Sequence, residues 1–162
     1  MYRHILVAVD GSPSSRAVTT HAYELAAQLG ASCTVLHVLD DVTVPFVNYG
    51  MEPYVNVEAI NPELIEAQRT GAERMVADLA RGAPGDVEVS GAVVEAGGRR
   101  IGQSITDEAE ARGADLVVVG THGHRGLSRV FVGSVADAVV RSADVPVTVV
   151  RVRDEDDEAG EA

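Results

Sequence analysis

The chain has 162 residues, with 25 Asp and Glu against 13 basic residues and a formal net charge of −12 at pH 7. The length suits one domain, and the acidic balance argues against a nucleic-acid partner, because such binding needs a basic face. All thirteen basic residues are Arg, which excludes a P-loop lysine and Schiff-base chemistry.

The two ends of the chain give further expectations. The ending "RDEDDEAGEA" contains six acids, and we expect residues 153–162 to form a disordered, solvated tail behind a domain over residues 1–152. Because no apolar run of about 18 residues and no signal-peptide profile occurs, we expect a cytoplasmic protein without a membrane partner. Acidic proteins without Lys are typical of salt-accumulating halophiles, although a high-GC genome would also deplete Lys.

The first half of the chain alternates strand and helix patterns. "RHILVAVD" at 3–10 predicts a strand, and the following "GSPSS" suits a helix start. A helix is predicted from 14 to 30, with one apolar face of Ala17, Ala22, Leu25, Ala26 and Leu29 and an end at Gly30. A second strand is predicted over 32–40. The pattern is lost over 41–60, where two of the prolines lie, and we expect a long loop there.

The second half continues the alternation. A helix is predicted over 61–82, with Leu64, Ile65, Met75, Val76 and Leu79 as its apolar positions. Further strands and helices follow in turn, namely a strand at 86–97, a helix at 99–113, a buried strand at 114–120, a helix at 134–143 and a strand at 145–152. This alternation predicts a three-layer α/β/α fold around a five-stranded parallel sheet. The ends of the first and fourth strands, at Asp10 and Gly120, are predicted to be neighbours.

The segment "GTHGHRGLSRVFVGS", from Gly120 to Ser134, contains four glycines, two arginines and no acid. Glycines allow a backbone to approach an anion closely, and the unpaired amides of the following helix start carry partial positive charge. The segment therefore predicts an anion site. The alternative of a flexible turn, in which the glycines have no binding role, stays open. Ser134 could add a hydroxyl donor or cap the helix.

The spacing Gly120-x2-Gly123-x9-Gly133-Ser134 resembles the nucleotide-binding signature of the universal stress protein family, in its ATP-binding branch. The resemblance extends over residues 1–152 through "ILVAVDGSPSS", "VLHVLD" and the long final segment. It implies an adenine nucleotide alpha hydrolase-like, Rossmann-like fold with strand order 3-2-1-4-5. It also implies ATP, or AMP or ADP, with Mg²⁺ as ligands, and a homodimer paired through the last strand at 145–150.

The same resemblance assigns roles to individual residues. Asp10 would lie near the ribose and a phosphate-bound Mg²⁺. This makes it the candidate metal residue, with a contact to the ion that could run through a water. Val38 would meet the adenine through its backbone. The remaining positions would line the pocket or hold the ribose and phosphates, and they are Ala8, Val9, Val119, Gly120, His122, Gly123, Arg125, Gly133, Ser134 and Val135.

Other motifs have simpler interpretations. "GGRRIGQS" (97–104) resembles a P-loop, but Gln103 stands where Lys is needed, so we expect only a strand-to-helix connection. His122 and His124 lack an evident third ligand for a metal. Asp10 could instead only cap the helix after it. Cys33 is expected to be a small buried residue, and His37 a structural one.

Three function classes remain open from the sequence. The first is a nucleotide-binding regulator or switch of the stress response. The second is a slow ATPase, although no general base is evidently aimed at a γ-phosphate and fast turnover is not expected. The third is a ligand-free dimerisation protein of the same fold, against which the intact glycine signature argues.

Overall fold

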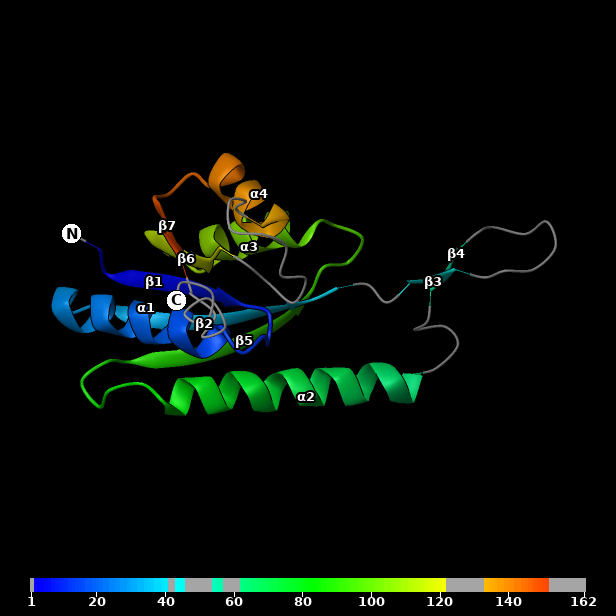
Figure 1. Ribbon diagram of the computed structural model, residues 1–162, viewed down its shortest axis with the longest axis horizontal. Coiled ribbons are helices and arrows are strands. Elements are labelled where there is room, and N and C mark those ends of the chain that lie inside the picture. Colours follow the sequence, from blue (N-terminus) through cyan, green and yellow to red (C-terminus); the bar gives the residue numbers. More distant parts are fainter. Residues whose placement is uncertain (1, 41–42, 46–53, 57–61, 122–132, 152–162) are drawn as a thin grey trace, which may run out of the picture.

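The computed structural model describes residues 2–40, 43–45, 54–56, 62–121 and 133–151. Within these residues a twisted sheet lies between two layers of helices, with α1 and α2 on one face and α3 and α4 on the other (Figure 1). The described helices are α1 (Ser15–Leu29), α2 (Pro62–Arg81), α3 (Ile101–Ala111) and α4 (Ser134–Ser142). The described strands are β1 (His4–Val9), β2 (Ser32–Leu39), β3 (Thr43–Pro45), β4 (Tyr54–Asn56), β5 (Val89–Glu95), β6 (Leu116–Gly120) and β7 (Val147–Val150).

The main sheet of the described chain has five strands, all parallel, in the order β5-β2-β1-β6-β7. This is the predicted order 3-2-1-4-5, and the three-layer Rossmann-like fold is confirmed. Pairing is continuous from His4 with Ser32 to Val9 with His37, so β1 is paired with β2 over its full length. Parallel strands require crossovers, and α1, α2, α3 and α4 supply them.

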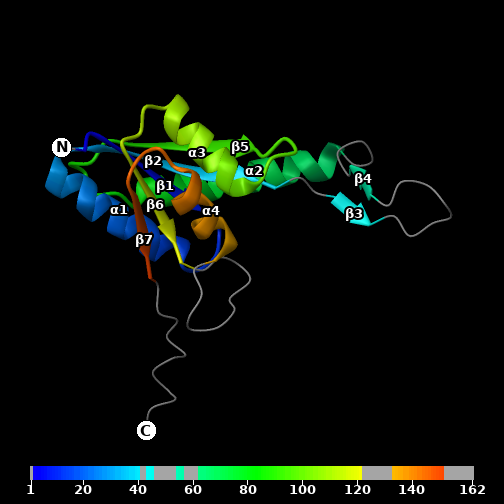
Figure 2. The same cartoon turned by 90° about the horizontal axis from the view of Figure 1, so that it is seen from above.

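The interpretation of residues 41–60 as a loop without strands was wrong in part. Strands β3 and β4 pair antiparallel there, with Thr43 opposite Asn56 and Pro45 opposite Tyr54. This hairpin lies beyond the end of the main sheet (Figures 1 and 2). Three-residue strands are too short to leave a period-2 pattern, and their pairing joins residues about ten positions apart, which local sequence patterns do not reveal.

The predicted apolar face of α1 is largely confirmed, since Ala22 and Ala26 are buried and Leu25 and Leu29 pack against the core. Val18, Ala22 and Ala26 face the sheet together with Tyr23, whereas Ala17 is exposed. The predicted end at Gly30 is confirmed, since this residue caps the helix at φ 64°, where glycine is the favoured residue. Of the predicted face only Ala17 was misassigned, and the neighbouring Val18 is buried in its place.

Helix α2 begins beyond the sheet. Its predicted core position Leu64 is 47% exposed, while Ala72 and Val76 further along are buried. A helix of 20 residues is about 30 Å long, whereas the seven residues of β5 extend only about 23 Å, so one end of α2 has no strand to cover. In the described part of the chain no helix is both long and apolar enough to span a bilayer.

Tyr23 joins the two helices of one layer. Its hydroxyl donates to the Leu79 carbonyl oxygen of α2 at 3.0 Å. Burial, with a smaller contribution from neighbouring Cys33, raises the pKa of Tyr23 from 10.0 to about 12. Burial also raises the pKa of the Cys33 thiol from 9.0 to about 12, so the thiol stays protonated and inert at neutral pH.

These two pKa values predict alkaline destabilisation. The folded state favours the neutral forms, so their stabilising effect is complete below about pH 9 and is lost as the pH rises toward about 12. We expect the free energy of unfolding, measured by urea denaturation, to fall across this range. Tyr23→Phe should lower it by about 0.5–1.5 kcal/mol at pH 7, because one hydrogen bond is lost while the Leu79 carbonyl oxygen keeps the Gly82 amide as a donor, and should make the alkaline decline shallower. An equally steep decline in wild type and variant would contradict this explanation.

Candidate functional site

Strands β1 and β6 end side by side at one edge of the sheet. Their last paired residues are Val7 and Val118, and each strand ends two residues further on, at Val9 and Gly120. The prediction that these two strand ends are neighbours is confirmed. The strand order reverses between β1 and β6, and ligands of doubly wound sheets bind outside the carboxyl ends of strands at such a point.

The start of α4 is tied to the end of β6. The Gly133 amide donates to the Thr121 carbonyl oxygen at 2.7 Å, across the two ends of the glycine segment. The Thr121 amide donates in turn to the Val150 carbonyl oxygen of β7 at 2.9 Å. Two strand ends and one helix start are thus joined by backbone hydrogen bonds. Since the Gly133 amide is already engaged, it is the following amides that can face a ligand.

The first turn of α4 exposes backbone donors. The first hydrogen bond within the helix runs from the Asp137 amide to the Gly133 carbonyl oxygen at 2.9 Å, so the amides of Ser134 and Val135 precede it and have no acceptor inside the helix. Such amides carry the partial positive charge of a helix start and favour an anion. The carboxylate of Asp137, which would oppose an anion, is paired with Arg141 at 2.9 Å.

Asp10 directly follows β1 and organises the start of α1. Its Oδ1 accepts the Ser12 amide at 3.0 Å and the Ser15 hydroxyl at 3.2 Å. The N-cap residue Ser14 makes no side-chain cap bond, and these two Asp10 bonds hold the turn before α1 and the first side chain of the helix rather than a helix amide. These contacts support a structural role of Asp10 at the start of α1. A role in ligand binding would be additional.

Four predicted positions are strand residues whose side chains belong to the core or pack against it. Val9 packs on the α1 and α2 side, whereas Val38, Val119 and the partly buried Ala8 pack on the α3 and α4 side. Val9, Val38 and Val119 are between 3% and 8% exposed. Their side chains are engaged in packing, so only their backbone is available to a ligand.

His37 lies at the same edge and was treated by sequence only as structural. Its Nδ1 donates to the Val9 carbonyl oxygen at 2.8 Å, which fixes the hydrogen of the ring on Nδ1 when the imidazole is neutral. The ring is half-buried. A polar residue near the carboxyl end of an otherwise apolar strand was the sequence signal for it.

The central part of the glycine segment lies outside the described residues. The predicted contacts of His122, Gly123 and Arg125, and the alternatives for His124 and Arg129, fall there. Gly120 and Gly133 are half-buried, and Ser134 and Val135 are exposed at the helix start. Among the described residues no group of three or more His, Cys, Asp or Glu side chains could hold a metal ion.

The P-loop-like segment forms the predicted strand-to-helix connection. Residues 96–100 form a turn, α3 begins at Ile101, and Gly102 lies inside that helix rather than in a loop. Gly102 is buried against Ala138 of α4. The absence of a side chain at position 102 allows α3 and α4 to pack closely.

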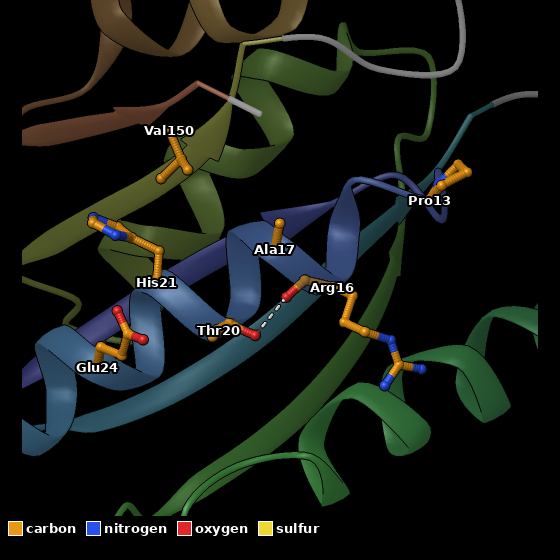
Figure 3. A pocket seen from close by; sticks show the side chains of 7 residues that line it. All are labelled: Pro13, Arg16, Ala17, Thr20, His21, Glu24 and Val150. Carbon is orange, nitrogen blue, oxygen red and sulfur yellow. Dashed lines mark hydrogen bonds between the residues drawn. The ribbon is translucent and has the colours of Figure 1, made fainter. Parts of the chain in front are cut away.

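An open groove of about 530 Å³ runs along the outer face of α1 (Figure 3). Figure 3 shows His21 and Arg16 pointing in different directions, with the Thr20 hydroxyl donating to the Arg16 carbonyl oxygen at 2.9 Å. None of the predicted site residues that the structure describes lines the groove. Its lining is Pro13, Arg16, Ala17, Thr20, His21, Glu24 and Val150.

The fold and this edge together define a doubly wound α/β protein with a candidate ligand site at its switch point. Residues 1–151 match the sequence pattern of the Universal stress protein family. The chain belongs to this family.

Individual relatives agree with this assignment. A universal stress protein of Mycolicibacterium smegmatis is 35% identical over 153 residues, which cover 92% of this chain and 46% of that protein. The chain thus spans about half the length of the mycobacterial relatives that it matches. The structure of universal stress protein UspA from Lactobacillus plantarum has a TM-score of 0.71 at 27% identity, and the match covers 93% of this chain and 98% of that one.

A second solved structure carries a ligand. The universal stress protein from Archaeoglobus fulgidus in complex with dAMP has a TM-score of 0.57 at 26% identity. The match covers 91% of this chain and 97% of that one.

Proposed function

We propose that this protein binds an adenine nucleotide, ATP or its products AMP and ADP, at the carboxyl ends of β1 and β6. The observation that carries the proposal is the bond from the Gly133 amide to the Thr121 carbonyl oxygen at 2.7 Å, which holds the donor-rich start of α4 beside the end of β6. The complex of the Archaeoglobus fulgidus relative with dAMP supports an adenine nucleotide as the ligand class.

The proposed contacts follow from what each residue offers. The Ser134 and Val135 amides and the Ser134 hydroxyl would donate to phosphate oxygens at the helix start. The Val38 backbone would meet the adenine, since its side chain is buried. Asp10 would accept a ribose hydroxyl. The remaining proposed contacts are those of Ala8, Val9, Val119, Gly120, His122, Gly123, Arg125 and Gly133.

The residues present fit a Mg²⁺ ion that is bound mainly by the nucleotide. Mg²⁺ keeps several waters and is usually held by one or two carboxylates together with substrate phosphates. Asp10 is a carboxylate at this edge, half-buried and oriented by Ser12 and Ser15. Asp10 would therefore hold the ion, which would supply neutralising charge for the β- and γ-phosphates.

The proposed biological role is a nucleotide-dependent regulator of the stress response, with hydrolysis absent or slow. The test is to denature the purified protein and identify any released nucleotide by mass spectrometry, then to titrate stripped protein with ATP and GTP by calorimetry in high salt. Binding of ATP with weaker binding of GTP is expected. Absence of any nucleotide binding would overturn the proposal, and phosphate release over hours would instead favour a slow ATPase.

We further propose a homodimer in which the last strand, within residues 145–150, pairs with its copy. Strand β7 is an edge strand of the sheet and its residues are half-buried. The Val117 amide donates to the Pro146 carbonyl oxygen and the Thr121 amide donates to the Val150 carbonyl oxygen. The backbone amides and carbonyls of the even-numbered residues in this segment therefore face β6. The backbone of Val147 and Val149 therefore faces outward, available to a second strand.

Val149→Pro tests the dimer directly. Proline removes the outward amide but none of the bonds toward β6, and proline is tolerated on edge strands. We expect the variant to sediment as a monomer in analytical ultracentrifugation while wild type sediments as a dimer. Thr148→Pro is the matched control, because residue 148 faces β6 and its substitution should lower thermal stability more. A Val149→Pro variant that remains dimeric would contradict pairing through this edge.

A further inference from the structure

Helices α3 and α4 meet at a point where one of them has no side chain. Gly102, the second residue of α3, is buried against α4. A Cβ atom at position 102 would lie 2.6 Å from the Ala138 Cβ, 3.4 Å from the Val135 carbonyl oxygen and 3.5 Å from the Val139 amide nitrogen. The Ala138 Cβ is fixed to the backbone of α4, so no side-chain rotation relieves this contact. A larger residue at 102 must move one helix away from the other.

Helix α4 has little freedom to absorb such a movement. Ala136 and Val139 bury its inner face in the core, with exposures of 2% and 0%. Its start is held by the Gly133 amide on the Thr121 carbonyl oxygen at 2.7 Å. Ala138 lies about one turn from the exposed amides of Ser134, so a displacement at the contact is carried to the helix start.

We propose that Gly102 is a positioning residue for nucleotide binding: its missing side chain lets α4 approach α3 closely enough to hold the amides of Ser134 and Val135 at the end of β6. The inference rests on the proposed function, because it concerns the same site. In this proposal Gly102 does not contact the nucleotide. It belongs to the P-loop-like segment 97–104, but its role is in helix packing and not in phosphate binding.

Gly102→Ala is the primary test. The added methyl group should force α4 away from α3 and raise the Kd for ATP about tenfold in calorimetry, since a shift of about 1 Å breaks hydrogen-bond geometry at the helix start. In the double variant Gly102→Ala with Ala138→Gly, the clashing atom is removed and the Kd should return to within about twofold of wild type. Ala138→Gly alone should also bind within about twofold, because it adds no atom.

Gly91→Ala is the matched control. A Cβ at position 91 would lie 2.5 Å from the Val76 Cγ1, on the face covered by α2, where rotation of the Val76 side chain can move the contacted atom. This variant should keep the wild-type Kd. Thermal unfolding of every variant separates misfolding from displacement of the site.

The outcomes separate the two proposals. If wild type binds no nucleotide, the proposed function is overturned. If wild type binds, the positioning role is overturned by a Gly102→Ala variant with wild-type affinity, by a double variant that stays weak, or by a Gly91→Ala variant that is equally weakened.

Discussion

Replacing Asp10 by asparagine is expected to weaken ATP binding in the presence of Mg²⁺ by about 10- to 100-fold while the fold is retained. Hydrogen bonds and contacts of a charged group are worth about 1.5–3 kcal/mol, which corresponds to this range of affinity. Asparagine keeps an oxygen for the Ser12 amide and the Ser15 hydroxyl, whose distances to Asp10 are 3.0 and 3.2 Å. The variant loses the negative charge and replaces the second carboxylate oxygen by an NH2 donor.

Asp10→Ala separates the two roles of this residue. Alanine removes the acceptor as well as the charge, so the bonds from the Ser12 amide and the Ser15 hydroxyl are lost and the free energy of unfolding should fall by about 0.5–1.5 kcal/mol in addition to the loss of affinity. Asp86→Asn removes the same charge near the opposite end of the sheet and should leave ATP binding unchanged. If Asp10→Asn binds ATP and Mg²⁺ as wild type does, Asp10 only holds the turn that leads into α1.

Leu36→Ala is expected to cost about 2–5 kcal/mol of unfolding free energy, a large share of the 5–15 kcal/mol that is typical of a domain. Leu36 is 0% exposed in the middle of β2 and packs in the cluster under α3 and α4. Truncation removes buried apolar surface and leaves a cavity that a close-packed strand cannot close. Urea denaturation would measure the loss.

Leu64→Ala is the control with the same chemical change. Leu64 is 47% exposed at the start of α2, and its truncation should alter the unfolding free energy by no more than about 0.5 kcal/mol. The contrast would also test the position of α2. A large loss at Leu64 would mean that the first turn of α2 is covered in solution.

The alternation of elements was predictable because buried parallel strands leave a strong pattern. Runs such as "ADLVVVG" are apolar on both faces of the sheet, and their amphipathic neighbours can only be crossover helices. The strand order came from resemblance, and the structure bears it out. The β3–β4 hairpin was missed, because strand pairing joins positions whose local composition says little.

The candidate site was predictable in part. Glycines and a helix start after the fourth strand indicated an anion site, and the adjacency of β1 and β6 agrees with it. The bond from Gly133 to Thr121 and the bond from His37 to Val9 could not be predicted, because each depends on where distant backbone atoms meet.

By itself, then, the sequence determined the class of fold, the absence of lysine chemistry and the region of the candidate site, since hydrophobic periodicity and residue type are local properties. Only the tertiary structure decided that Val18 rather than Ala17 is buried in α1, how much of α2 lies beyond the sheet and why residue 102 is glycine. These depend on the distance between elements remote in sequence. At Gly102 that distance leaves no room for a single methyl group.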